Sequence, residues 1–210
     1  MKPYWIANWR KYVTVVYFDL ETAGVEDYRP DIQLAAVAVD EDLIEVASIE
    51  MKIQFDVALA DPEALRINHY DAAVWRDQAL PLPTVVARFG RFLDSFKTLQ
   101  RVSKRTGRPY KVAQLAGHNA ATFDGPRLKS MYTRAGVFLG ADPRVLDTMQ
   151  LAMWWFHQRR MEPENYKLAP LCQYFGIPVG DDAHDALADV RLTVRLAKAL
   201  LTEGAVLPAA

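Results

Sequence analysis

The sequence has almost no cysteine and no long apolar run. Cys172 is the only cysteine in 210 residues, which excludes a disulfide within the chain and a cysteine-based zinc site, and it fits a reducing compartment. The longest apolar runs, 34–39 and 151–156, are too short to span a bilayer. Residues 1–11 include charged and polar side chains where a signal peptide needs an apolar core. We therefore expect a cytoplasmic protein with no membrane partner.

An excess of charge of either sign is also missing. The formal net charge is −1 and hydrophobic residues make up 51% of the chain, which is ordinary globular composition. The overall balance does not point to nucleic acid, so any basic footprint must be local. A chain of this length can bury about 70% of its unfolded surface. Because no repeat or linker divides the sequence, we expect one domain over 1–210 with its core at about 12–203.

Apolar and β-branched runs predict three strands at the start of the chain, over 12–20, 32–39 and 43–53. The acidic turn 40–42 joins the last two, which favours an antiparallel start to the sheet. The remaining expected elements are a short strand over 112–115, a helix that follows residue 148, and helices over 62–67, 83–96, 123–135, 168–174 and 185–203.

Two acids at the end of the first strand share one face. Because side chains alternate along a strand, Asp19 and Glu21 point the same way as Tyr17. Burying ionised carboxylates without a partner costs several kcal/mol each, and no lysine or arginine lies between Lys11 and Arg29. A divalent metal ion would neutralise them, since hard cations take carboxylate oxygens. The alternative is that Asp19 caps a turn and Glu21 is solvated.

Two helices each carry a further acid on the side that faces inward. Asp189 lies in line with Leu196 and Leu200, opposite a polar stripe, and Asp124 shares a stripe with Leu128. An unpaired carboxylate does not belong in the interior. The alternatives are a structural salt bridge for Asp189 and a helix N-cap for Asp124.

His184 lies five residues before Asp189. On one continuous helix their side chains would diverge by about 140°, so both can face one site only if His184 precedes the helix. Asp185 can be a cap or a further ligand. Four inward acids and a histidine from three segments suit two divalent ions, because ions about 3.5–4 Å apart stabilise both oxygens of a phosphoryl displacement. A nearby histidine can take the proton of the attacking water.

A strongly basic stretch runs from Lys97 to Lys111. It holds six positive side chains and no acid, and Gly107 and Pro109 predict a loop. A flexible basic arm can contact a phosphate backbone, whereas the alternative is a solvated surface loop. The residues expected to make these phosphate contacts are Arg101, Lys104, Arg105 and Arg108.

Three motifs resemble, in order, those of the DEDDh family of 3′→5′ exonucleases. They are Asp-Leu-Glu-Thr at 19–22, Gly-His-Asn at 117–119 continuing to Phe-Asp at 123–124, and His-Asp-Ala-Leu-Ala-Asp at 184–189. The sister DEDDy group has tyrosine where this chain has Asp185. The resemblance covers nearly the whole chain. It implies a ribonuclease H-like α/β fold, with a central mixed five-stranded sheet whose first three strands are antiparallel, flanked by helices.

The resemblance also implies roles for individual residues. The expected ligands of two Mg²⁺ or Mn²⁺ ions are Asp19, Glu21, Asp124 and Asp189. His184 would be the general base that activates water against the terminal phosphodiester. The expected substrate-binding or site-shaping residues are Leu20, Thr22, His118, Asn119 and Phe123. The substrate would be the 3′ end of a nucleic acid, and the products would be nucleoside 5′-monophosphates.

Two features depart from the proofreading members of this family. His118 and Asp124 are six positions apart, where proofreading subunits have five, and the residues after Asp124 look more like TREX-type DNA exonucleases. About twenty residues follow Asp189, too few for the polymerase-binding tail of bacterial proofreading subunits. We therefore expect a stand-alone exonuclease that acts on single-stranded or frayed DNA. The oligomeric state is open, with a homodimer among the options.

Two other functions stay open. An exoribonuclease of the same family would use the same chemistry, because only contacts near the ribose 2′-hydroxyl distinguish the two sugars. A catalytically inactive nucleic-acid-binding module usually lacks one of the acids or the histidine, whereas all five positions are filled here.

Overall fold

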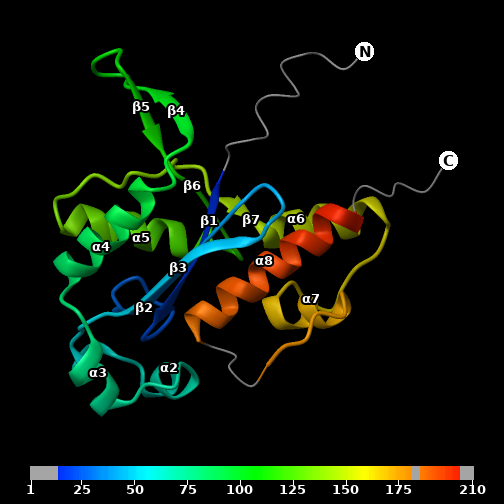
Figure 1. Cartoon of the computed structure of the whole chain (residues 1–210). Helices are drawn as coiled ribbons and strands as arrows, with labels where there is room; N and C mark the ends of the chain where they lie inside the picture. The colour runs from blue at the N-terminus through cyan, green and yellow to red at the C-terminus, as the bar shows by residue number, and fades with distance from the viewer. Residues whose placement is uncertain (1–13, 181–184, 204–210) are drawn as a thin grey trace.

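The computed structural model describes residues 14–180 and 185–203. Figure 1 shows a twisted sheet with helices on both of its faces. In chain order the elements are β1 (Val15–Thr22), β2 (Asp31–Val39), β3 (Glu45–Lys52), the 3-10 helix η2 (Val57–Leu59), α2 (Pro62–Ile67), α3 (Ala72–Gln78), α4 (Leu82–Asp94), β4 (Leu99–Val102), β5 (Pro109–Val112), β6 (Gln114–Gly117), α5 (Asp124–Arg134), β7 (Leu146–Asp147), α6 (Thr148–Gln158), α7 (Leu168–Tyr174) and α8 (Ala186–Glu203). Within these described residues, no helix combines the length and apolar character that crossing a membrane requires.

Five strands form the main sheet, in the order β3-β2-β1-β6-β7. The pairs β1–β2 and β2–β3 are antiparallel, whereas β1–β6 and β6–β7 are parallel. The predicted mixed sheet with an antiparallel start is therefore confirmed. Parallel pairing with β6 covers only Val15 to Tyr17. The second half of β1 therefore extends beyond β6, and this half contains Asp19 and Glu21.

The two faces of the sheet pack against different helices. Phe18 and Leu20 of β1 belong to a core shared with α4 and α5, whereas Tyr17 belongs to a core shared with α8. Every residue of β2 is buried, because alternate side chains enter one core or the other. Strand alternation therefore directs Asp19 and Glu21 toward α8, on the face of Tyr17, as the sequence predicts.

The observed elements differ from the prediction at several places, including the end of β1 and helix α3. β1 continues through the acids to Thr22, because pairing with β2 extends to Glu21 opposite Gln33. The strand end is thus decided by the neighbouring strand rather than by the acids. Helix α3 was not predicted, since only Trp75 of its seven residues is buried and it shows no apolar periodicity.

The basic stretch is a β-hairpin, so the prediction of a flexible loop over 97–111 is wrong. β4 and β5 pair antiparallel from Leu99 opposite Val112 to Val102 opposite Pro109. Gly107, with a φ of +68°, serves the turn between them. The turn residues stand out in the sequence, but the four-residue strands on either side are too short to do so. In Figure 1 the hairpin projects from the sheet, near the start of β1.

Candidate metal-dependent active site

The first two acids lie on the face of β1 that packs against α8. Glu21 is only 8% exposed and Asp19 is partly buried. Gln33, the cross-strand neighbour of Glu21, is buried and donates from Nε2 to Glu50 Oε1 at 2.8 Å and to Asp185 Oδ2 at 3.4 Å. Gln33 therefore links the sheet to the segment that enters α8.

The third acid begins α5 beside the same strand. Asp124 is 3% exposed, and its Oδ1 accepts a hydrogen bond from the backbone N–H of Leu20 at 3.3 Å. This N–H lies beyond the last pair of the β1–β6 ladder, so the carboxylate takes a place that a parallel strand would otherwise fill. The N-cap of α5 is Phe123, and the alternative in which Asp124 caps the helix is therefore excluded.

A close backbone approach fixes the start of α5. Gly125 donates from its N–H to the carbonyl oxygen of Ala120 at 2.7 Å. A Cβ at this position would lie 2.8 Å from that oxygen, closer than real Cβ atoms come. Only glycine therefore allows the preceding loop to press against the helix and hold Asp124 toward β1.

The fourth acid lies in the first turn of α8. Asp189 is partly buried, and its neighbour Val190 packs in the core between α8 and the sheet. Asp185 caps the helix, because its Oδ1 accepts from Leu187 N at 3.2 Å and Ala188 N at 3.1 Å. Of the two roles left open for Asp185, the structure shows the cap.

Electrostatics show that these acids share one region. Burial raises the pKa of Asp19 well above its usual range, and the charges of Asp124, Glu21 and Asp189 raise it further. Burial, followed by the charge of Asp189, raises the pKa of Glu21 to about 8. Burial also raises the pKa of Asp124 to about 7, against the opposing effect of the Leu20 N–H. The protein alone thus disfavours the ionised form of all three carboxyl groups.

These carboxylates fit a divalent cation by their chemistry. In the part of the chain that the structure describes, Asp19, Glu21 and Asp124 form no ion pair with arginine or lysine. Over the same residues, no three His, Cys, Asp or Glu side chains are grouped closely enough to hold a metal ion as they stand. Hard cations prefer such oxygen donors and relieve their repulsion, so binding would have to draw the side chains closer together.

His184, the predicted general base, lies outside the described residues. Leu20 and Thr22 are at the end of β1, where their backbone groups are already engaged. The N–H of Leu20 is bonded to Asp124, and the carbonyl oxygen of Thr22 accepts from Asn68 Nδ2 at 2.8 Å. The Thr22 side chain donates to the carbonyl oxygen of Gly24 at 2.8 Å. These bonds hold the strand end in one conformation.

His118 is fixed at both ring nitrogens in the loop after β6. Nδ1 lies 2.9 Å from Thr148 Oγ1, and Nε2 lies 2.8 Å from the carbonyl oxygen of Tyr166. Burial lowers the pKa of His118, which favours the neutral ring. Both nitrogens are therefore committed to holding α6 and the segment before α7, a geometry that suits site shaping rather than proton transfer.

Asp147 is a residue that sequence reasoning missed. Its carboxylate accepts from the backbone N–H of Asn119 and Ala121 at 3.0 Å each, and from Met149 N at 2.9 Å as the N-cap of α6. Asn119 has a φ of +58°, which asparagine tolerates better than most residues. Asp147 therefore fixes the loop that leads to Asp124. Its position directly before a helix is the signal for the cap, but not for the loop contact.

Phe123 and Arg101, both expected to contact substrate, already have partners within the protein. The ring of Phe123 lies against the guanidinium of Arg127, 4.8 Å from its centre. Arg101, expected to contact phosphate, instead pairs with the carboxylate of Asp142. Lys104, Arg105 and Arg108 are exposed on the hairpin. The hairpin leads into β6, which pairs with the start of β1, so these side chains are about 20 Å or more from the acids.

No family model matches the chain. One curated relative, Protein NEN3 of Arabidopsis thaliana, is 32% identical over 83 residues, which is 40% of this chain and 15% of that protein. The match therefore covers a part of each molecule.

Solved structures of E. coli exonuclease I are similar in fold. A zinc-bound complex with single-stranded DNA matches with a TM-score of 0.70 and 21% identity over 92% of this chain. A complex with a dT13 oligonucleotide matches with the same TM-score and identity over 90% of it. This chain spans 41% of the length of each. The chain thus resembles E. coli exonuclease I in its fold.

Proposed function

We propose that this protein is a metal-dependent 3′→5′ exonuclease that removes nucleoside 5′-monophosphates from the 3′ end of a nucleic acid. One observation carries the proposal. Asp19, Glu21, Asp124 and Asp189 come from three distant segments, and the charges of Asp124 and Asp189 add to burial in raising the pKa of Asp19 and Glu21, where β1 extends beyond β6. A fold gains no stability from such repulsion, so a cationic ligand accounts for it.

In this proposal the four acids would hold two divalent ions, Mg²⁺ or Mn²⁺. When bound, such ions supply positive charge for the attacking and leaving oxygens of the phosphodiester and lower the pKa of water. The zinc-bound exonuclease I complex supports metal binding on this fold.

The chain's own residues would accept the proton of the attacking water and position the acids. His184 would accept the proton of the attacking water at a ring nitrogen, as the resemblance implies. Asp124 is aimed by the Leu20 N–H and by the close approach of Gly125, while Asp147 fixes the loop before it. The end of β1, held through Thr22 by Asn68, would be the floor against which the 3′-terminal nucleotide lies.

Single-stranded DNA is the substrate that we favour. The similar exonuclease I structures include complexes with dT13 and dA16 oligonucleotides. RNA is the alternative, because nothing in the carboxylate chemistry distinguishes the sugars.

The deciding experiment uses 5′-labelled single- and double-stranded DNA and RNA of matched sequence, with Mg²⁺ or with EDTA. Ladders that shorten from the 3′ end only with Mg²⁺ are expected, faster on single-stranded DNA. Cleavage of RNA alone would make the protein an exoribonuclease. Binding without product, unchanged by EDTA, would overturn catalysis and leave a nucleic-acid-binding module.

A further inference from the structure

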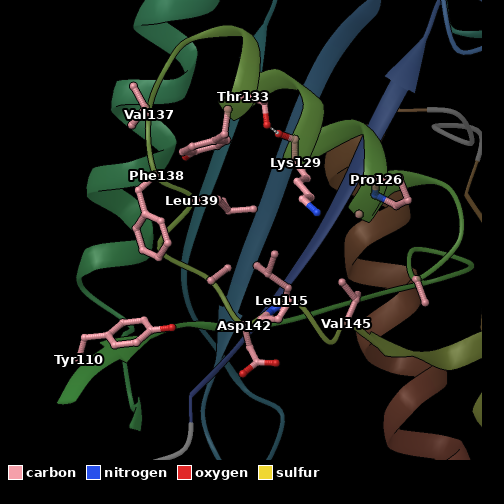
Figure 2. A pocket seen from close by; sticks show the side chains of 15 residues that line it. Tyr110, Leu115, Pro126, Lys129, Thr133, Val137, Phe138, Leu139, Asp142 and Val145 are labelled. Carbon is pink, nitrogen blue, oxygen red and sulfur yellow. Dashed lines mark hydrogen bonds between the residues drawn. The ribbon is translucent and has the colours of Figure 1, made fainter. Parts of the chain in front are cut away.

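A groove outside the carboxylate site runs beneath α5. Its volume is about 600 Å³, and its lining is mostly apolar. Figure 2 shows Pro126 and Val145 at one end and Tyr110 and Phe138 at the other, with Lys129 of α5 reaching in from above. None of these residues belongs to the three motifs, and the proposed chemistry does not use them.

One end of the groove lies next to the proposed active site. Gly125 and Pro126 line it, and they directly follow Asp124. Further along α5, the lining continues through Lys129 to Thr133. Since an eleven-residue helix is about 16 Å long, the groove extends from the acid end of α5 to the helix's far end.

The far end of the groove presents two exposed aromatic rings. Tyr110 is 40% exposed and Phe138 is 70% exposed, although large aromatic side chains are usually buried. Their ring centres are 6.2 Å apart with an interplanar angle of 70°. Two accessible rings at a groove end offer a stacking surface for bases.

Positive charge continues from this aromatic end. Tyr110 is in β5 of the basic hairpin, opposite Arg101 of β4, and Arg108 directly precedes β5. Lys104 and Arg105 lie at the hairpin tip. The one acid lining the groove, Asp142, is neutralised by Arg101 and Arg144. The route is thus apolar, then aromatic, then cationic, which complements the bases and phosphates of one strand.

We infer that this groove binds the nucleotides of a single strand upstream of the 3′ end that is being cleaved. The inference rests on the proposed function. Bases would pack in the groove and against Tyr110 and Phe138, while the phosphates would meet Lys129 and the hairpin. The hairpin therefore acts at a distance from the acids, on the part of the substrate that leaves the site. Long strands gain affinity from this route, whereas strands of a few nucleotides do not reach it.

The test compares strands of two lengths on a variant that does not cleave them. In an Asp19→Ala background with EDTA, the double substitution Tyr110→Ser/Phe138→Ser should weaken binding of a thymidine strand of about 20 nucleotides at least about 5-fold, with a strand of about four unchanged. Trp154→Ser is the matched control, because Trp154 is 65% exposed on α6, away from the groove. Tyr110→Phe should keep the affinity for the long strand.

The same substitutions on the active protein separate this proposal from the proposed function. KM for long strands should rise while kcat for short strands stays unchanged. Equal affinity of the double variant and its parent for the long strand would overturn the groove assignment and favour a protein ligand there. A wild-type protein that cleaves no substrate would instead refute the exonuclease, while length-dependent binding through the groove could still be measured.

Discussion

Buried carboxylates occur in two different settings in this molecule. Asp31 pairs with Arg127 at 3.2 Å and with Arg134 at 3.3 Å, and Asp142, whose side chain has no exposed surface, pairs with Arg101 and Arg144. Burial disfavours the charge of Asp142, but hydrogen bonds from Arg144 and Arg101 hold its pKa below the usual range. The acids around β1 have raised pKa values instead.

The difference teaches how to distinguish structural acids from candidate ligands. The same chain supplies two arginines to each structural acid, so arginine was available to the fold. Arg127 even lies near Asp124 and favours its charge, yet its hydrogen bonds go to Asp31 and to backbone carbonyl oxygens. Asp19, Glu21 and Asp124 therefore have no arginine or lysine ion-pair partner among the described residues, which suits ligands for a divalent cation.

The largest effect should come from removing one acid of each kind. Asp19→Ala should reduce cleavage to background while largely sparing binding of single strands in EDTA, because it removes a proposed metal ligand. Asp31→Asn should instead lower the free energy of unfolding by about 3–5 kcal/mol, since Arg127 loses its buried partner. The turnover per folded molecule should stay unchanged. Labelled-oligonucleotide ladders and thermal melts measure the two effects. Retained turnover in Asp19→Ala would refute the metal role.

The next largest effect concerns the proposed base. His184→Ala should lower the rate about 10²–10⁴-fold. It should also remove the acidic limb of the pH profile, where protonation of the general base lowers the rate. His118→Asn is the comparison, since both ring nitrogens of His118 hold neighbouring segments. It should lower stability and leave the shape of the pH profile unchanged. A His184→Ala protein with the parental pH profile would show that another group takes the proton.

The pH dependence of stability should be smaller but diagnostic. A carboxyl group whose pKa is raised on folding binds more protons in the folded state, so stability falls as pH rises. For Glu21 and Asp124, with folded pKa values of about 8 and about 7, the melting temperature in EDTA should fall between about pH 4 and pH 8. Added Mg²⁺ should reverse this loss near pH 8, and Glu21→Gln should flatten the slope. A melting temperature that is flat in EDTA over this range would count against the raised values.

The smallest effect should come from the hairpin charges. Replacing Lys104, Arg105 and Arg108 by glutamine should weaken binding of long strands and lower the salt slope by about 0.7 for each phosphate that the protein no longer neutralises. Arg195→Gln with Lys198→Gln, on the outward side of α8, is the control and should leave the slope as it is. An identical slope in the hairpin variant would show that these side chains are solvated and contact no phosphate.

Much of the sheet and the position of the acids could be predicted from the sequence. Alternation along β1 and periodicity along the helices depend on local geometry, so Asp19, Glu21 and Asp124 were directed toward the interior correctly. No lysine or arginine lies close to Asp19 and Glu21 in the sequence, and neither acid has an arginine or lysine ion-pair partner among the described residues.

What could not be predicted depends on contacts between distant segments. Arg101 looked like the other basic residues of its stretch until the fold brought Asp142 beside it. The loop contact of Asp147, 26 residues after Ala121, leaves no local pattern. Likewise, the groove exists only because α5 passes over β6 and over residues 137–145, which follow α5. Charge runs indicate polarity in a sequence, but not which of their members are already paired.

The hydrogen bond between the Leu20 N–H and Asp124 has one further consequence. An ion held by Asp124 would draw electron density from the carboxylate that accepts this proton, and so would weaken the hydrogen bond. The amide resonance of Leu20 is then a built-in reporter: titrating Mg²⁺ should shift its chemical shift and speed its exchange with solvent deuterium. A single backbone signal would follow the loading of the whole centre without any substrate present.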